Sequence, residues 1–363
     1  MPINKAEKSF IQFAFRLNKH YPGLIDTYFG PKEIPREIGK EPKISLKALL
    51  NNAGELSDRL ETATIEENRR IYIVEQLQGL RFFLEHKVLN KYSHKELISK
   101  IYQFDFEYAD DRVLSQRIKE LEEKEEPREK LYGTDFFNYF KSKIAEFKEK
   151  SGKFFDIPKG DLVEVEEGVV KMMAYMRYLG NFKTKITLNP NFQRTKKFIE
   201  NLVAHETYPG HHLNYSLQEK AHPKDSLFGL FLYHTPNDAI VEGIGEFGPE
   251  LVGYNKDELT ILRWQTRINA NLLYYDKGDK RDSVKEYLVG VGKYSSAEAE
   301  NYLKFMEAEF YDIYYPCYWA GYQVIKKSYE KCKGVGKEKE FLDLLYSEYL
   351  TPNLLRKRVS EVL

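Results

Sequence analysis

Apolar residues recur every three or four positions through most of this chain, and a period near 3.6 predicts helices rather than strands. The clearest case is the segment 71–89, in which Ile73, Leu77, Leu80 and Leu84 share one helical face. The same pattern predicts further helices at 45–61, 95–105, 112–125, 136–149, 161–180, 193–207, 211–221, 237–252, 256–276, 281–290, 296–313, 318–332 and 337–349. We therefore expect a mainly α, multi-helix fold.

One segment departs clearly from that period. Residues 183–190, KTKITLNP, alternate polar and apolar side chains, and Pro190 ends the run. Alternation is typical of a strand, and proline interrupts one because it cannot donate to a β-ladder. We therefore expect a small β-sheet directly before the segment that carries most of the histidines.

The length of 363 residues gives room for one large domain or two ordinary ones. By its pattern the chain divides into a helical N-terminal part, 1–158, and a second, catalytic part, 159–363, which carries the strand and the histidines. We expect the two parts to form one continuous fold, because no low-complexity linker separates them.

Charge and composition exclude several classes of function. Lys plus Arg and Asp plus Glu number 56 each, and a nucleic-acid binder would need a cationic excess. The strongest apolar stretch, 227–233, is far shorter than the roughly 20 residues of a membrane-spanning helix. The N-terminus lacks a signal-peptide pattern, and two cysteines exclude a disulfide framework. We expect a cytoplasmic protein that binds neither nucleic acid nor membrane; its oligomeric state stays open.

The histidines gather in one place. Five of the eight fall between positions 205 and 234, and three of them stand in the run 205–212, which reads HETYPGHH. Imidazole suits zinc, and a Glu beside a ligating His can act as general base toward metal-bound water. The sequence therefore predicts one zinc ion per chain, with His205 as a ligand and Glu206 as the base.

The second ligand has to come from beyond Pro209, which occupies the place of the second His in an H-E-x-x-H helix. On a regular helix His205 and His212 would lie about 10 Å apart along the axis, too far for two Zn–N bonds of about 2.0–2.1 Å. Pro209 and Gly210 can break the helix and bring a later His beside His205. We favour His211, which follows the glycine as in H-E-x-x-G-H; His212 is the alternative.

A third ligand is expected from another helix. Glu242 is our choice, because it lies near the start of the predicted helix 237–252 and is followed by Gly243, which permits close approach. Glu246 and Glu250 on the same helix are the alternatives. Two His, one Glu and an open position make up the ligand set of a catalytic zinc site rather than a structural one.

The run 205–212 resembles the H-E-x-x-P-G-H-H signature of a large, uncharacterised family that is grouped with the gluzincin-type zinc metallopeptidases. The family carries E-G-W-A-x-Y-x-x-E downstream; residues 242–250, EGIGEFGPE, keep the Glu-Gly, an aromatic residue and the last Glu but lack the Trp and Ala. It has Y-x-P-G-Q-A and a further Tyr near the C-terminus; residues 314–322, YYPCYWAGY, lack the Gly-Gln. The similarity covers roughly residues 160–330.

The resemblance implies a zinc-metallopeptidase-like fold and hydrolysis of a peptide or a related amide. Glu206 would take a proton from water activated by the metal and pass it to the leaving amine. The tetrahedral oxyanion would need a donor, for which Tyr322, Tyr314 and His234 are the candidates in that order. By the same similarity, the strand 184–189 would be an edge strand that pairs with substrate.

Three hypotheses follow. The first is a zinc-dependent peptidase for short peptides, with Asn189 helping to orient the substrate. The second keeps the metal but hydrolyses another amide bond. The third is a non-catalytic helical scaffold that binds metal, against which Glu206 speaks because a structural site has no use for a general base. The same ligands would also accept manganese, cobalt or iron.

Overall fold

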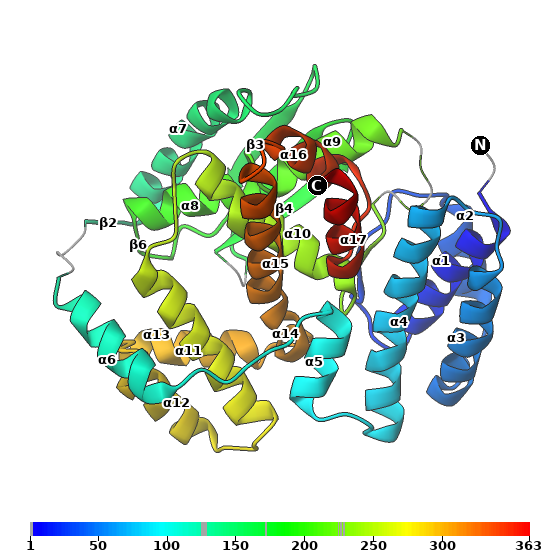
Figure 1. The fold of residues 1–363 in the computed structure, drawn as a ribbon, viewed down its shortest axis with the longest axis horizontal. Coiled ribbons are helices and arrows are strands. Elements are labelled where there is room, and N and C mark those ends of the chain that lie inside the picture. The colour runs from blue at the N-terminus through cyan, green and yellow to red at the C-terminus, as the bar shows by residue number, and fades with distance from the viewer. Residues whose placement is uncertain (1–2, 125–128, 171–172, 224, 226, 228) are drawn as a thin grey trace.

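Helices dominate the computed structural model (Figure 1), so the expected mainly α fold class with small sheets is confirmed. The structure describes residues 3–124, 129–170, 173–223, 225, 227 and 229–363. Its helices are α1 (Lys5–Asn18), α2 (Glu33–Lys40), α3 (Leu46–Glu61), α4 (Glu67–Leu89), α5 (His94–Tyr102), α6 (Asp111–Glu122), α7 (Gly133–Ser151), α8 (Lys196–Glu206), α9 (His211–Ala221), α10 (Pro236–Leu251), α11 (Glu258–Tyr275), α12 (Arg281–Gly290), α13 (Ser296–Met306), α14 (Tyr311–Tyr314), α15 (Pro316–Lys333), α16 (Glu338–Ser347) and α17 (Pro352–Val362). Its strands are β1 (Ile25–Thr27), β2 (Lys130–Leu131), β3 (Leu162–Glu167), β4 (Ala174–Gly180), β5 (Lys183–Leu188), β6 (Arg194–Thr195) and β7 (Phe231–Leu232).

Two helices, α10 and α15, cross at the centre of the molecule (Figure 1). A Cβ on Gly321 of α15 would lie 1.7 Å from the carbonyl oxygen of Ala239. A Cβ on Gly243 of α10 would lie 2.6 Å from the backbone of Gly321. The two backbones therefore pack directly against each other, and this contact holds the chain around residues 314–322 close to the middle of α10.

The other helices surround this crossing (Figure 1). The helices α1 to α4 lie on one side, α6 with α11 to α13 lie on the other, and α16 and α17 lie beside α15. One cluster of buried apolar residues includes Phe10 and Leu77 as well as Ile244. The hydrophobic core thus contains residues from both 1–158 and 159–363. Within the described residues, no helix is both long and apolar enough to cross a membrane.

A three-stranded sheet contacts α9. In it β5 lies between β3, with which it is parallel, and β4, with which it is antiparallel. The predicted strand 183–190 is confirmed, but its expected place at the sheet edge was wrong, because both sides of β5 are hydrogen-bonded. Asn189 is engaged beyond its end: its side chain donates to the carbonyl oxygen of Val170 and accepts from the N–H of Asn191. The edge strands are β3 and β4.

The prediction of a helix over 161–180 was wrong. This segment forms β3 and β4, and residues 171 and 172 between them lie outside the described residues. In β4, Ala174 and Tyr178 are the buried residues. A spacing of four fits a helical period and also two steps along one face of a strand, so periodicity alone could not separate the two.

The predicted helix 296–313 is divided into α13 and α14. Phe310, between them, has a φ of 72°. This left-handed conformation cannot continue a right-handed helix. The structure also contains α1, α2 and α17, which the sequence analysis did not identify.

Adding a methyl group at the helix crossing should destabilise the protein. We expect Gly321→Ala to lower the free energy of unfolding by about 1–3 kcal/mol, the usual cost of overpacking. Gly54 inside α3 is the matched control, since a Cβ there meets nothing within 4 Å. Gly54→Ala should raise stability by about 0.4–1 kcal/mol. Denaturant unfolding measures both, and equal stabilities would contradict the close backbone contact.

Candidate metal centre

Only four residues separate α8 from α9, and they fold the chain back on itself. The N–H of Gly210 donates to the carbonyl oxygen of Ala204 at 2.9 Å. A Cβ on Gly210 would lie 1.8 Å from the carbonyl oxygen of His205, so only glycine permits this approach. The rings of His205 and His211 consequently lie with centroids 4.5 Å apart and planes at 81°. The expected helix break, which brings a later histidine beside His205, is confirmed.

Glu242 on α10 completes a cluster with these two histidines. Its Oε2 atom lies 3.4 Å from Nε2 of His205 and 3.5 Å from Nε2 of His211. One ligand atom from each of the three residues lies within 4.8 Å of the others. Two ligands held tetrahedrally at about 2.0–2.1 Å from zinc are about 3.3–3.4 Å apart. The spacing of His205, His211 and Glu242 therefore fits a divalent ion.

The two oxygens of Glu242 have different surroundings. Oε1 accepts a hydrogen bond from the hydroxyl of Tyr314 on α14. Oε2 is buried and, among the described residues, has no hydrogen-bond partner. Burying a carboxylate oxygen without a partner is costly, and a bound cation would remove that cost. Tyr314 thus fixes the side chain while the second oxygen faces both imidazoles.

The charges of the cluster shift the pKa values of its members. Burial lowers the pKa of His205, but neighbouring carboxylates, Glu242 first, outweigh burial and raise it to about 9. Burial raises the pKa of Glu242, but His211 and His205 outweigh it and hold that pKa well below its ordinary value. The carboxylates therefore create a negative potential that stabilises a cation at this place.

Glu246 lies one helical turn after Glu242 and faces the other ring nitrogen of His205. Its Oε1 is 3.6 Å from Nδ1 of His205, and its Oε2 forms an ion pair of 2.9 Å with Lys256. Carboxylates beside the second nitrogen of a ligating His commonly fix the orientation of the ring. Gly245 leaves room for that ring, because a Cβ there would lie 2.6 Å from it. Glu246 is outside the three-residue cluster.

His212, the alternative second ligand, is engaged elsewhere. Its Nε2 lies 2.5 Å from Oδ2 of Asp161, and its Nδ1 lies 2.7 Å from the hydroxyl of Thr184. The ring is fully buried. Asp161 also accepts a hydrogen bond from Tyr208 and forms an ion pair of 2.6 Å with Lys148. These contacts connect the segment between α8 and α9 to the sheet, so the role of His212 here is to hold the break in place.

Glu206, the predicted general base, is the last residue of α8 and is partly buried. Within the described part of the chain, no group donates a hydrogen bond to its carboxylate. Burial raises the pKa of Glu206, while His205 and His211 oppose that shift. Among the described residues, no side chain therefore occupies the oxygens of Glu206.

Tyr322, the first predicted oxyanion donor, binds another partner. Its hydroxyl donates to Oε1 of Glu250 at 2.6 Å, and Lys326 pairs with the other oxygen of that carboxylate. Glu250, an alternative ligand, is therefore compensated by these two groups. It lies eight residues after Glu242, which is about 12 Å along the helix. Neither Tyr322 nor Glu250 belongs to the three-residue cluster.

His234, another predicted oxyanion donor, is fully buried. Its ring stacks on Phe83 with centroids 4.6 Å apart, and neither nitrogen has a hydrogen-bond partner among the described residues. Burial lowers the pKa of His234 to about 3, so the ring is neutral. Among the described residues, no hydrogen bond connects His234 to the three proposed ligands.

Tyr318, which was not predicted from the sequence, lies beside His205. Its ring stacks on that of His205 with centroids 6.2 Å apart and planes at 16°. In the described part of the chain its hydroxyl has no hydrogen-bond partner. Tyr314, Tyr318 and Tyr322 recur at intervals of four, which places them along one helical face. That spacing could have identified Tyr318, because a residue midway between two tyrosines on one helical face points in the same direction as they do, toward α10.

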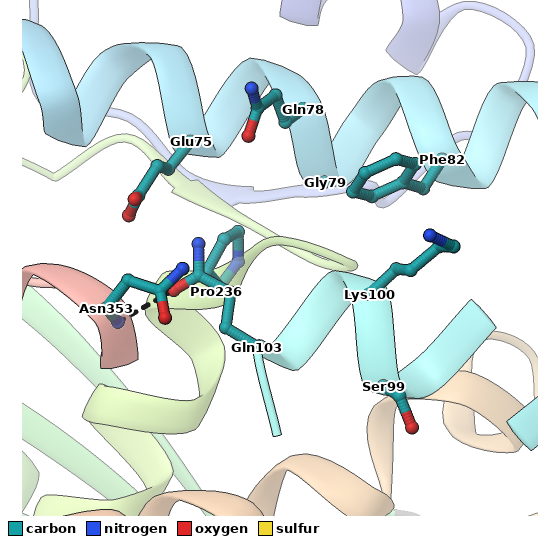
Figure 2. Close-up of a pocket in the computed structure, with 9 residues that line it drawn as sticks. All are labelled: Glu75, Gln78, Gly79, Phe82, Ser99, Lys100, Gln103, Pro236 and Asn353. Atoms are coloured by element: carbon teal, nitrogen blue, oxygen red, sulfur yellow. Dashed lines mark hydrogen bonds between the residues drawn. The ribbon is translucent and has the colours of Figure 1, made fainter. Parts of the chain in front are cut away.

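A pocket of about 340 Å³ lies elsewhere, beside α4, α5 and the first residues of α10 and α17 (Figure 2). Its lining residues are Glu75, Gln78, Gly79, Phe82, Ser99, Lys100, Gln103, Pro236 and Asn353. Inside it the N–H of Asn353 donates to the side chain of Gln103 at 2.8 Å (Figure 2). None of these residues belongs to the metal-ligand cluster, so this pocket is separate from the candidate centre.

Comparison with known proteins identifies the fold alone. No family model matches the chain, and no curated protein matches its sequence. Among solved structures, a candidate lipoprotein from Colwellia psychrerythraea is 13% identical with a TM-score of 0.56, covering 87% of this chain and 69% of that one. A candidate lipoprotein of unknown function from Shewanella oneidensis is 12% identical with a TM-score of 0.51, covering 96% of this chain and 82% of that one. At such identities the likeness concerns the arrangement of the backbone.

Removing the carboxylate that binds His212 should destabilise the break between α8 and α9. We expect Asp161→Asn to lower the free energy of unfolding by about 3 kcal/mol, because His212, Tyr208 and Lys148 all lose a buried anionic partner. Asp156→Asn is the control, since that side chain is 92% exposed. Thermal unfolding should show an unchanged midpoint for the control. An unchanged midpoint for both variants would contradict a structural role of Asp161.

Proposed function

We propose that this protein is a zinc-dependent peptidase that hydrolyses short peptides. The observation that carries the proposal is the buried Oε2 of Glu242, which has no hydrogen-bond partner among the described residues and lies nearly equally far from Nε2 of His205 and Nε2 of His211. Two His, one Glu and an open position are typical of catalytic zinc sites. The presence of Glu206 directly beside His205 favours catalysis over a structural role for the metal.

When bound, zinc would lower the pKa of a coordinated water and polarise the carbonyl of the scissile amide. Glu206, whose carboxylate has no hydrogen-bond partner among the described residues, would accept the water proton and deliver it to the leaving amine. Glu246 and Lys256 would hold the ring of His205 through its Nδ1 side. Tyr314 would hold Glu242 in the orientation that the ligand needs.

The oxyanion of the tetrahedral intermediate needs a donor near the metal. Tyr322 and His234 stay proposed donors, but Tyr322 is bound to Glu250 and His234 is stacked on Phe83. Tyr318 is better suited, because its ring stacks on His205 and its hydroxyl has no partner in the described part of the chain. We therefore add Tyr318 to the proposed donors and place it before Tyr322, Tyr314 and His234.

An extended substrate would need a strand edge beside the metal. Since β5 is central, β4 takes this proposed role: it is an edge strand, and the ring of Tyr178 on it lies 5.5 Å from that of Tyr215 on α9. Tyr215 in turn stacks on His211 at 6.2 Å. A peptide that pairs with β4 would therefore lie along the side of the cluster on which His211 sits.

The alternatives share these residues. Another metal-dependent amidohydrolase would use the same ligands and Glu206 on a different amide, and a non-catalytic scaffold would bind metal without turnover. Manganese, cobalt or iron could replace zinc at such ligands.

We propose the cytoplasm as the compartment, supported by Cys317 and Cys332, which are both free and buried. The balance of 56 basic and 56 acidic residues supports a substrate other than nucleic acid.

Replacing the proposed general base should abolish turnover without loss of metal. We expect Glu206→Gln to keep its zinc and to lose about 10²–10⁴-fold in the rate of peptide hydrolysis, because the amide cannot accept the water proton. The exposed Glu164→Gln on β3 is the control and should retain the wild-type rate. Rates on a library of short peptides and zinc content per chain are the two measurements.

Two results would contradict the proposal. Hydrolysis at the wild-type rate by Glu206→Gln would exclude the assigned mechanism. Absence of hydrolysis by the zinc-loaded wild-type protein on every peptide, with cleavage of another amide, would favour the amidohydrolase instead.

A further inference from the structure

A short ribbon near the cluster is irregular at one residue. Strands β1 and β7 pair antiparallel, with Ile25 opposite Leu232 and Thr27 opposite Phe231. The register shifts between Ile25 and Thr27, so Asp26 is the extra residue of a bulge. Bulges re-aim side chains and are common beside active sites. The bulge therefore sets the direction of the Asp26 carboxylate.

The ribbon is built against the residues that support the proposed metal ligands. The ring of Phe231 lies 4.6 Å from that of Tyr215, and Tyr215 stacks on His211. The ring of Tyr233, directly after β7, lies 4.7 Å from that of Tyr314, whose hydroxyl binds Glu242. Asp26 thus belongs to a ribbon whose aromatic side chains contact two tyrosines of the site: Tyr215, which stacks on His211, and Tyr314, which binds Glu242.

The charge of Asp26 adds to this picture of the ribbon beside the cluster, because it and nearby groups shift one another's pKa values. Burial raises the pKa of Asp26, the hydrogen bond from Thr27 opposes this shift, and the charge of Glu242 raises the pKa further. Burial also raises the pKa values of surrounding tyrosines, with the charge of Asp26 among the further causes; these are Tyr175, Tyr215, Tyr233 and Tyr311. The carboxylate of Asp26 is therefore within electrostatic range of Glu242 and of aromatic residues from β4, α9 and α14.

Asp26 has no cationic partner in the described residues. Its Oδ2 accepts a hydrogen bond of 3.1 Å from the hydroxyl of its neighbour Thr27, and part of the residue's surface reaches solvent although neighbouring groups cover the carboxylate. The other carboxylates differ: Glu246 has Lys256, and Glu242 faces two histidines. Asp26 is thus a partly covered anion on a bulge, and no cationic side chain among the described residues compensates its charge.

We propose that Asp26 binds the protonated α-amino group of the substrate, so that the enzyme acts on peptides with a free amino terminus and cleaves close to that end. This inference rests on the proposed function. An ammonium group offers three donors to the carboxylate, and a hydrogen bond between two charged groups is stronger than one between neutral groups. The edge strand β4, which carries Tyr175, would guide the following residues of the peptide.

The test compares two peptides that differ only in the charge at the amino end. Tri-alanine amide and acetyl-tri-alanine amide are titrated by calorimetry into zinc-loaded Glu206→Gln protein, which should bind without turnover. We expect the free amine to bind about 10- to 100-fold more tightly than the acetylated peptide, as for loss of one charge-assisted hydrogen bond. Adding Asp26→Asn should remove that difference, and Asp26→Glu should keep part of it.

Asp58→Asn, at an exposed aspartate of α3, is the matched control and should leave the preference unchanged. Equal affinity for the two peptides, binding of neither, or a preference that survives Asp26→Asn would overturn the role of Asp26. The proposed function is tested separately, by measuring whether the wild-type protein hydrolyses the same peptides. Since binding is measured without turnover, the two failures are distinguishable.

Discussion

The contact of Gly210 with the last turn of α8 is the constraint on which the candidate centre depends. Its missing side chain lets the backbone reach the carbonyl oxygens of Ala204 and His205. Any larger residue would push α9 away, and His211 with it. The buried Asp161 and His212 hold the same break from the sheet side. The eight residues 205–212 thereby supply two proposed ligands, a proposed base and a structural histidine, although a regular helix would hold the two ligands apart.

The second constraint is the crossing of α10 and α15. Because Gly243 and Gly321 have no side chains, the two helices meet backbone to backbone. Glu242 then lies within reach of the hydroxyl of Tyr314, and Tyr318 lies over His205. The cluster is therefore the meeting point of two close approaches, each set by glycine. Its carboxylates favour a positive charge at this place, which either a protonated His205 or a bound cation would supply.

Much of this arrangement could be predicted from the sequence, because it is encoded locally. The run HETYPGHH indicated both the break and the meeting of two histidines, and the helices of the second half have strong periods. The segment 161–180 could not be assigned correctly, since Ala174 and Tyr178 fit both periods. The central place of β5 could not be predicted either, because pairing with β3 depends on a partner that was read as helix.

Within the site, the sequence alone could not distinguish between residues of the same type that lie close together in the chain. Glu242, Glu246 and Glu250 stand four apart on α10, and only the partners supplied by distant segments distinguish them: Lys256 for Glu246, and Tyr322 with Lys326 for Glu250. The same holds for His211 and His212, which differ in that Asp161 and Thr184 bind the latter. Long-range contacts of this kind leave no local pattern.

The most direct test of the account is the zinc content per chain, measured by elemental mass spectrometry on protein purified without a histidine tag. We predict about one equivalent in the wild-type protein and its loss in His211→Ala, because His211 is one of only three proposed protein ligands. Wild-type protein that holds no zinc after supply of the metal and removal of the excess would contradict the account. So would a full equivalent retained by His211→Ala.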